Sequence, residues 1–366
     1  MLNLSWMDID ILPDSIGELK HLRYLDLSSN NKMKVLPDTI TKLHHLQTLL
    51  LEHCTSLEEL PRDIQHLISL EYLNIDNCQA LKYLSKGLRE LTSLQRLGRF
   101  IVNSVEESFS AAATLNELRD LNDLRNSLTI EHLEKVKNVE FESKEANLKK
   151  KKRLQSLKLY WRSSLHWSPS SPATVASEKD ESLLNNLEPH PNLKELMVSY
   201  YGGVRFSSWL SSLTNLVDLQ IAHLRNCQRL PPLDHLSSLR CLVLVELNAL
   251  EYVAESFPLP CSRSGKPFFP SLKTLCIQRC SNLKGWWRTK NENQGSIAEL
   301  LCFPCLSKLE IMGCPDLTSM PLFPSLDQNL TLEDASIRPL QQTLKMTMTE
   351  ANMTSEEASS SSSRST

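Results

Sequence analysis

Four cysteines have the spacing that comes closest to a metal centre in this sequence. Cys276 and Cys280 form a C-x-x-x-C pair, and Cys302 and Cys305 form a C-x-x-C pair. Four thiolates in such an arrangement can bind zinc tetrahedrally. The competing interpretation is structural, because Cys280 occupies a recurring Asn or Cys position and Cys276 falls at an exposed position of a predicted strand. We favour the structural interpretation and expect no metal site and no cofactor.

Patterns typical of catalysis or nucleotide binding are missing. The chain has no G-x-S-x-G motif, and its ten histidines are dispersed, so no set of Ser, His and Asp stands out. Its one Gly-Lys pair, Gly265-Lys266, lacks the glycine spacing of a phosphate-binding loop. We therefore expect no catalytic residues and do not predict nucleotide binding by these residues.

A basic run and four tryptophans each have two interpretations. Residues 149–153 read KKKKR, which is typical of a nuclear-import signal or a phosphate-binding patch, but also of a solvated helix face before a strand. Trp161, Trp167, Trp286 and Trp287 could anchor an interface, as aromatic side chains often do. Trp161 follows a predicted strand and could reach a binding rim, whereas the 286–287 pair equally suits the core of a long repeat.

Composition and charge exclude several classes of function. The 366 residues include 40 Lys and Arg and 43 Asp and Glu, for a net charge of −3, whereas general nucleic-acid binding needs a basic domain. The opening MLNLSWMDID lacks the basic start and apolar run of a signal peptide, and no apolar stretch reaches about 18 residues. The ten cysteines are scattered, which favours reduced thiols. We expect a cytoplasmic protein, with a nuclear location left open, that has no membrane span and binds no nucleic acid.

Leucines recur with a fixed period in the first part of the chain. The leading leucines are Leu22, Leu46, Leu70 and Leu94, so each unit has 24 residues. Within these units apolar residues follow three and five positions later, and Asn or Cys follows eight positions later. This spacing pattern is the leucine-rich-repeat signature L-x-x-L-x-L-x-x-N/C-x-L. Less regular units resume at Leu193 and continue towards the C-terminal part of the chain.

The period predicts a solenoid of class α/β. The local alternation suits a strand with one buried face, and the wider spacing after it suits an outer turn of helix. One repeat cannot bury its own leucines, so neighbours stack into a curved, parallel β-sheet on the concave face, with short helices and loops on the convex face. The Asn or Cys position should bond the backbone of the adjacent repeat. These structural positions are Asn30, Cys54, Cys78, Cys280 and Cys314.

Residues between the leucines point away from the core and should line the concave face, where solenoids usually bind proteins. The predicted protein-binding residues are Arg23, Tyr24, Asp26, Gln47, Thr48, Glu71, Tyr72, Asn74, Lys158, Tyr160, Lys194, Glu195, Asp218, Gln220, Arg240, Lys273, Lys308 and Glu310.

The regularity of the repeats divides the chain into five segments. We expect regular repeats of 23–24 residues in 1–97, irregular repeats with an inserted helix in 98–162, and a Ser- and Pro-rich loop in 163–180. Irregular repeats should follow in 181–340, and a disordered Ser-rich tail in 341–366. Because the first strand begins in mid-repeat without a polar cap, we interpret the chain as lacking an N-terminal region. A longer parent protein, a truncated gene or a mis-called start would each account for this.

Several stretches resemble one family. IGELKHLRYLDLSSN, SLTIEHLEKVKNV and FPSLKTLCIQRCSNLKGW are similar to the repeat region of plant intracellular nucleotide-binding leucine-rich-repeat disease resistance proteins of the coiled-coil class. The resemblance covers about residues 1–335. It implies a non-catalytic recognition and autoinhibition module that contacts a pathogen effector or a guarded host protein. It also implies a nucleotide-binding domain, normally in cis, which these residues do not contain.

Two other functions were weighed. A general intracellular leucine-rich-repeat scaffold, or a ubiquitin-ligase substrate adaptor, would also bind partners through its concave face, but an adaptor needs an F-box-like region. A secreted receptor ectodomain usually has a signal peptide, paired capping cysteines and Gly-x-Ile-Pro after each strand, which this sequence lacks. The resistance-protein interpretation therefore depends mainly on the resemblance, and the residues alone predict an intracellular leucine-rich-repeat binding protein.

Overall fold

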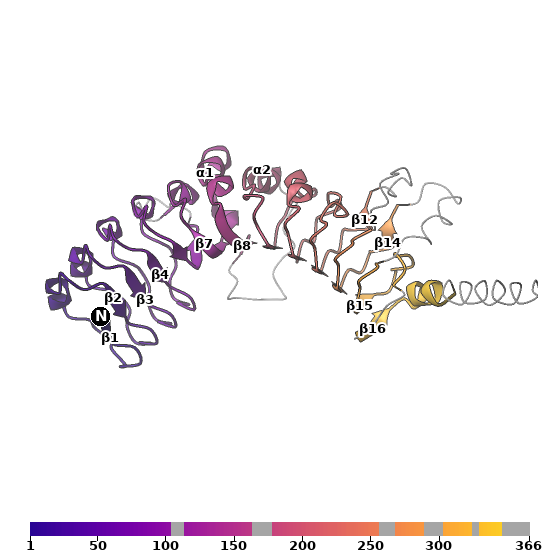
Figure 1. Cartoon of the computed structure of the whole chain (residues 1–366). Coiled ribbons are helices and arrows are strands. Elements are labelled where there is room, and N and C mark those ends of the chain that lie inside the picture. The colour runs from indigo at the N-terminus through magenta and orange to yellow at the C-terminus, as the bar shows by residue number, and fades with distance from the viewer. Residues whose placement is uncertain (104–112, 163–177, 256–267, 289–302, 324–328, 346–366) are drawn as a thin grey trace, which may run out of the picture. The chain divides into compact units, whose positions relative to one another are not determined.

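The structure is a computed structural model of the chain. It describes residues 1–103, 113–162, 178–255, 268–288, 303–323 and 329–345. These residues group into two compact units, unit 1 up to Gly202 and unit 2 from Gly203 onward. Both units consist of parallel strands with helical turns and loops on the other side of each repeat (Figure 1). The predicted leucine-rich-repeat solenoid fold is thereby confirmed.

The first part of unit 1 is a parallel sheet whose strands follow one another in chain order. These strands are β1 (Leu2–Asn3), β2 (Tyr24–Asp26), β3 (Thr48–Leu50), β4 (Tyr72–Asn74) and β5 (Arg96–Leu97). Leu25 lies opposite Leu49, and Leu49 lies opposite Leu73, in register with the period of the sequence. Because equivalent positions align, their side chains form straight rows across the sheet.

The second part of unit 1 is a further run of parallel strands in chain order. These strands are β6 (Arg99–Ile101), β7 (Arg125–Glu131), β8 (Arg153–Tyr160) and β9 (Glu195–Ser199). Gly98 separates β5 from β6. A Cβ atom at this position would lie 2.7 Å from Oδ1 of Asp76, so a larger residue would displace that carboxylate.

Short helices occupy the other side of the repeats in unit 1. The 3₁₀ helices are η1 (Asp14–Glu18), η2 (Asp38–Lys42), η3 (Ile64–His66), η4 (Leu88–Glu90), η5 (Leu115–Leu118), η6 (Leu133–Lys135) and η7 (Leu148–Lys150). Two α-helices accompany them, α1 (Val139–Glu145) and α2 (Glu178–Asn186). Asn138 caps α1 by accepting a hydrogen bond from the amide of Phe141 at 3.2 Å, which is the usual role of Asn at this position.

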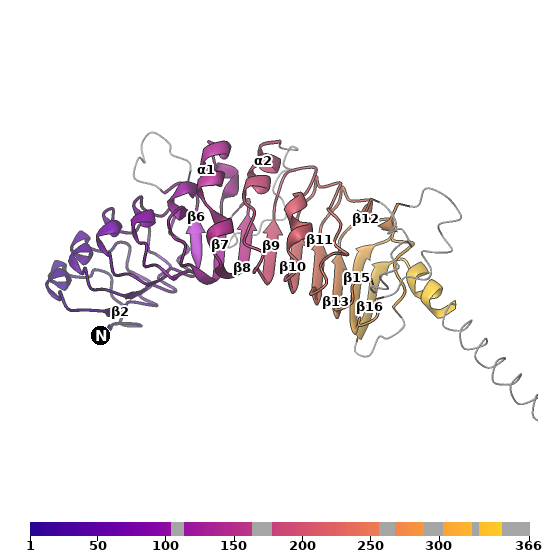
Figure 2. The same ribbon diagram turned by 45° about the horizontal axis from the view of Figure 1, so that its top comes forward.

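Unit 2 has parallel strands of the same kind, which lie side by side in Figure 2. Its elements are η8 (Ser208–Ser212), β10 (Asp218–Ala222), β11 (Cys241–Val245), β13 (Thr274–Gln278), β15 (Lys308–Cys314) and β16 (Asn329–Ala335), with outer strands β12 (Tyr252–Ala254) and β14 (Gly285–Trp287). Leu242 pairs with Leu275, and Leu275 with Leu309, although these repeats are longer. The sheet register is therefore kept, and the extra residues fall outside the sheet strands.

The leucines of the repeat signature form the core. Leu25, Leu49 and Leu73 in unit 1 and Leu219 and Leu242 in unit 2 are 0% exposed. Burying one leucine side chain contributes roughly 1.5–3 kcal/mol, so the stacked leucine rows provide the main stabilisation of each unit. No helix among the described residues is long and apolar enough to cross a membrane.

The Asn and Cys positions connect neighbouring repeats through the backbone. Nδ2 of Asn30 donates hydrogen bonds to the carbonyl oxygens of Leu4 at 2.9 Å and Leu27 at 2.7 Å. Sγ of Cys54 donates to the same carbonyl of Leu27 at 3.2 Å. The thiols of three other cysteines donate to a backbone carbonyl in the same way. These contacts are Cys78 to Leu51 at 3.0 Å, Cys280 to Leu244 at 3.9 Å and Cys314 to Ile277 at 3.8 Å. In these repeats a buried carbonyl thus has a side-chain partner in the next repeat.

Both interpretations of the KKKKR run assume exposed side chains, but one of its lysines is buried. Lys151 is 0% exposed, and its Nζ donates hydrogen bonds to the carbonyl oxygens of Leu118 at 2.6 Å and Leu121 at 3.1 Å. Lys149 forms an ion pair with Glu188 at 2.8 Å. The run is therefore partly a structural element of unit 1 and not a uniformly solvated face.

Of the four tryptophans with two interpretations, the three that the structure describes belong to the core. Trp161 is 2% exposed, and its ring packs edge-on against Tyr201 with centroids 5.1 Å apart, so it does not reach a rim. Trp286 and Trp287 are buried as well. The ring of Trp286 packs edge-on against that of Phe303, with centroids 5.2 Å apart. Trp167 lies outside the described residues.

Two segment boundaries differ from the expected ones. Within 98–162, where an inserted helix was expected, the structure has α1 and the short η5, η6 and η7. The expected loop 163–180 is described only from residue 178, where α2 begins. Residues 341–345, expected in the tail, continue a helical segment that starts at 338, and the rest of the tail lies outside the described residues.

Candidate functional site

The face of each sheet opposite the helical turns, here called the open face, carries the side chains that alternate with the core leucines. In the first part of unit 1, the register aligns Tyr24, Thr48, Tyr72 and Arg96 in one row. The guanidinium of Arg96 lies over the ring of Tyr72, 5.4 Å from its centroid. Burial, and then the neighbouring Asp26 carboxylate, raises the pKa of Tyr24. The row therefore consists of three half-buried side chains, two of them aromatic, and the exposed Arg96.

A hydrogen-bonded ladder lies at the edge where these strands begin. Glu71 accepts hydrogen bonds from Nε2 of Gln47 at 3.4 Å and from Nε2 of Gln95 at 3.3 Å. Gln95 in turn accepts a hydrogen bond from the guanidinium of Arg125. Because each partner belongs to a successive repeat, this edge presents a continuous polar rim in unit 1.

A buried ion pair lies on the open face where β5 gives way to β6. Nη2 of Arg99 is 2.7 Å from Oε2 of Glu131, and the two side chains are 8% and 0% exposed. Nη1 of Arg99 also donates a hydrogen bond to the carbonyl oxygen of Cys78 at 3.1 Å. The pair therefore connects the two parts of unit 1 and is not available to a ligand.

The open face of unit 2 combines a surface ion pair with two thiols. Lys308 and Glu310 are 2.8 Å apart. Burial and the Glu310 carboxylate raise the pKa of Cys276 to about 11, and burial and Asp218 raise the pKa of Cys241 to about 11. Cys276 is 7% exposed, so our expectation of an exposed position was wrong. Both thiols stay protonated at neutral pH and are poor nucleophiles.

One residue shortly after several of the strands adopts a left-handed backbone conformation, which the sequence did not reveal. Its φ is 59° at His53, 60° at His223, 54° at Glu246 and 52° at Arg279. The conformation costs roughly 1–2 kcal/mol for such residues. In compensation, its amide donates to a carbonyl of the next repeat, as from His223 to Val245 at 2.7 Å. The ends of these strands are thus held by the following repeat.

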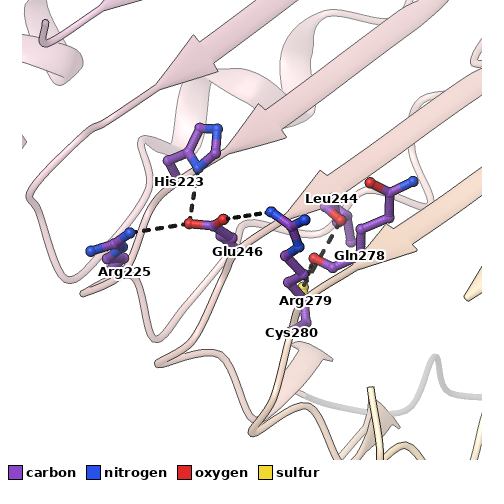
Figure 3. A network of polar contacts seen from close by, with 7 residues as sticks. All are labelled: His223, Arg225, Leu244, Glu246, Gln278, Arg279 and Cys280. Atoms are coloured by element: carbon purple, nitrogen blue, oxygen red, sulfur yellow. Dashed lines mark hydrogen bonds and ion pairs between the residues drawn. The ribbon is translucent and has the colours of Figure 1, made fainter. Parts of the chain in front are cut away.

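In unit 2, three of these strand ends and one neighbour form a charged cluster around Glu246 (Figure 3). The Glu246 carboxylate is 3.0 Å from Nδ1 of His223, 3.3 Å from Nη2 of Arg225 and 3.4 Å from Nη1 of Arg279. Burial alone would raise the pKa of Glu246, but the hydrogen bonds from these three side chains outweigh it and lower the pKa. Glu246 is therefore ionised at neutral pH.

The predicted protein-binding residues fall into two groups. On the strands lie Tyr24, Asp26, Thr48, Tyr72, Asn74, Lys158, Tyr160, Glu195, Asp218, Gln220, Lys308 and Glu310. Immediately before a strand lie Arg23, Gln47, Glu71, Lys194, Arg240 and Lys273. Asp26 and Asn74 are buried, because their side chains accept hydrogen bonds from the amides of Ser28 and Asp76, each at 2.9 Å. They shape the strand ends and offer little surface to a partner.

Neither a metal centre nor a charged pocket forms among the described residues. The described residues contain no group of three or more His, Cys, Asp or Glu side chains that could hold a metal ion, and Cys302 of the proposed zinc set lies outside them. A pocket of about 310 Å³ beside β12 is lined by Arg229, Tyr252, Glu255 and Arg288, among others. Arg229 pairs with Glu255 at 2.9 Å, and Arg288 acts on the carboxylate of Glu251 in the same lining, so the two arginines and two glutamates of this pocket balance in charge.

Two family models match the chain. The R13L1/DRL21 leucine-rich-repeat model matches residues 115–247, and a general leucine-rich-repeat model matches 2–57 and 20–79. Among solved structures, a leucine-rich-repeat protein of Leptospira interrogans aligns with a TM-score of 0.43 and 20% identity, over 94% of this chain and 93% of that one. An internalin of Listeria monocytogenes aligns with a TM-score of 0.44 and 19% identity, over 90% and 80% of the two chains.

Relatives with named roles occur in plants. The "Putative disease resistance protein RGA1" of Solanum bulbocastanum is 42% identical over 336 residues, which is 91% of this chain and 30% of the relative. The "Disease resistance protein RGA2" of the same species is 37% identical over 226 residues, which is 61% of this chain and 21% of the relative. The chain thus spans less than a third of the length of these relatives.

Proposed function

Because this chain belongs to the leucine-rich-repeat family and is related along most of its length to plant disease resistance proteins, we propose that it is a recognition and autoinhibition module of plant defence. The module has no catalytic role of its own. It binds a pathogen effector or a guarded host protein through its open face. It also holds a nucleotide-binding domain, normally in cis, in its inactive state, and it acts in the cytoplasm or the nucleus.

The observation that carries this proposal is the row of aligned side chains on the open face of unit 1. Tyr24, Thr48, Tyr72 and Arg96 stand on short strands whose intervening leucines are fully buried. A partner would meet aromatic side chains that are already ordered, and such residues make the strongest contributions to protein interfaces. Solenoids bind partners through surfaces of this kind.

We assign the two roles to different units. The first part of unit 1 has regular repeats and a hydrogen-bonded rim, which suits permanent docking of a domain within the same protein. Unit 2 has repeats of unequal length and a charged strand edge, and unequal loops are where binding specificity usually varies. Unit 2 therefore recognises the partner that activates the protein.

A chimera tests this function. The matching region of a full-length resistance relative is replaced by residues 1–366, and cell death is scored in leaf tissue without an elicitor. Exchanging Arg23→Glu, Tyr24→Ala and Tyr72→Ala together should cause cell death, because the inhibitory contact is lost. The control, Glu18→Ala with Lys42→Ala on η1 and η2, should stay silent at equal protein level. Absence of cell death with the open-face variant would rule out autoinhibition through unit 1.

A further inference from the structure

The cluster around Glu246 fixes two arginines at one edge of unit 2 (Figure 3). Arg225 follows β10, Glu246 follows β11 and Arg279 follows β13, so each belongs to a different repeat. The Glu246 side chain is only 12% exposed, and it lies 3.3 Å from the guanidinium of Arg225 and 3.4 Å from that of Arg279. One shielded carboxylate therefore orients two guanidinium groups.

The two arginines keep donors for a further partner. A guanidinium has five N–H donors, and the contacts with Glu246 involve Nη2 of Arg225 and Nη1 of Arg279. The side chains of Arg225 and Arg279 are 37% and 67% exposed. With one carboxylate and two guanidinium groups, the cluster has a net positive charge even when His223 is neutral.

The backbone beneath the cluster is held in place. Glu246 and Arg279 both have left-handed conformations, and their amides donate to the carbonyl oxygens of Gln278 at 2.9 Å and Met312 at 2.7 Å. Preorganised groups lose less conformational freedom on binding. Arg279 is thus presented on a fixed edge, and the ion pair with Glu246 connects Arg225, in the turn after β10, to the same edge.

The basic character of this edge is not a general property of the repeats. At the ends of β3 and β4 in unit 1, the left-handed positions that correspond to Glu246 and Arg279 are His53 and Asn77. The left-handed conformation recurs at both edges, but in this comparison only unit 2 has an arginine at one of these positions. The arginine is therefore a property of this edge of unit 2 and not of the repeat geometry.

We propose that Arg225 and Arg279 bind an acidic segment of a partner protein, with carboxylates of that segment bridging the two guanidinium groups. Arg and carboxylate groups form strong, often bidentate hydrogen bonds, which supply both affinity and orientation. This inference rests on the proposed recognition role of unit 2, and it names the chemistry of the segment that unit 2 recognises.

Peptide binding to the purified full chain tests the inference. The probe is a fluorescein-labelled peptide of alternating Glu and Ser, and fluorescence anisotropy gives its affinity. Two matched peptides replace every Glu by Gln or by phosphoserine. The protein variants are Arg225→Gln and Arg279→Gln, and the controls are Arg229→Gln and Lys284→Gln. The control side chains are also exposed and also paired with glutamates, at 2.9 Å and 2.7 Å, but they lie by the outer strands.

The Glu peptide should bind and the Gln peptide should not. Arg225→Gln and Arg279→Gln should each weaken binding at least about tenfold, equivalent to about 1.4 kcal/mol, while both controls bind as the wild type does. Equal losses in the controls would reduce the effect to net charge and overturn the proposal. Binding of the phosphoserine peptide alone, or no binding of the Glu peptide, would overturn it too. Because this assay involves no cell death, its failure is distinct from failure of the chimera.

Discussion

The thiol of Cys78 donates a hydrogen bond to the carbonyl oxygen of Leu51 in the preceding repeat, across 3.0 Å. Both groups are shielded from water, and burial raises the pKa of Cys78 to about 12. Burial also raises the pKa of Cys54, which makes the equivalent contact one repeat earlier. A cysteine can thus take the place of the asparagine of the repeat signature because its weak donor satisfies the same backbone acceptor.

This relationship predicts which thiols react. A raised pKa means a smaller thiolate fraction at any pH below it, and the thiolate is the reactive form. Brief treatment of the folded chain with iodoacetamide at pH 8 should therefore leave Cys54 and Cys78 unmodified, whereas the exposed Cys305 is alkylated. Peptide mass spectrometry measures each site. Alkylation of Cys78 at the rate of Cys305 would contradict the buried contact.

The ion pair between Arg99 and Glu131 predicts an asymmetric response to substitution. Glu131→Ala leaves the buried guanidinium without its carboxylate, and such a loss typically costs about 3–5 kcal/mol. The double substitution Arg99→Met with Glu131→Leu removes both charges and should recover most of that stability. Urea denaturation of the three proteins measures the difference. A double variant as unstable as Glu131→Ala would show that the pair itself is indispensable.

Lys151 predicts an unusual dependence of stability on pH. Burial lowers the pKa of Lys151 from 10.5 to about 8. Between these values the unfolded state keeps its proton while the folded state releases it, so stability rises with pH in this window. Relative to Lys151→Met, the wild type should gain up to about 3 kcal/mol between pH 8 and pH 10.5. Denaturant titrations at several pH values measure this gain, and a constant difference would contradict a depressed pKa.

The fold could be predicted from the sequence because the leucine spacing states the repeat length directly. Leu25, Leu49 and Leu73 are equivalent in sequence and also pair in the sheet. The strand register follows once the period is known, even where the repeats lengthen, because only one alignment buries every leucine. The positions of the helical turns were less certain, because 3₁₀ turns need only three or four residues and leave a weak periodic signal.

The charged cluster in unit 2 could not be predicted from the sequence. His223, Glu246 and Arg279 come from repeats of different length, so no fixed spacing connects them. Their left-handed conformation is set by the course of the chain, and side chains as different as histidine and glutamate adopt it. Lys151 was missed for a similar reason, because a run of basic residues does not reveal which member meets buried carbonyls.

The central claim, that the open face of unit 1 holds the nucleotide-binding domain, is tested most directly by an affinity measurement. The nucleotide-binding region of a full-length resistance relative is titrated calorimetrically with residues 1–366. The variant Arg23→Glu, Tyr24→Ala and Tyr72→Ala should bind at least about tenfold more weakly than the wild type. The outer-face variant, Glu18→Ala with Lys42→Ala in the helical turns η1 and η2 opposite the open face, should bind as the wild type does. Equal affinities for all three proteins, or a loss confined to the outer-face variant, would contradict the account.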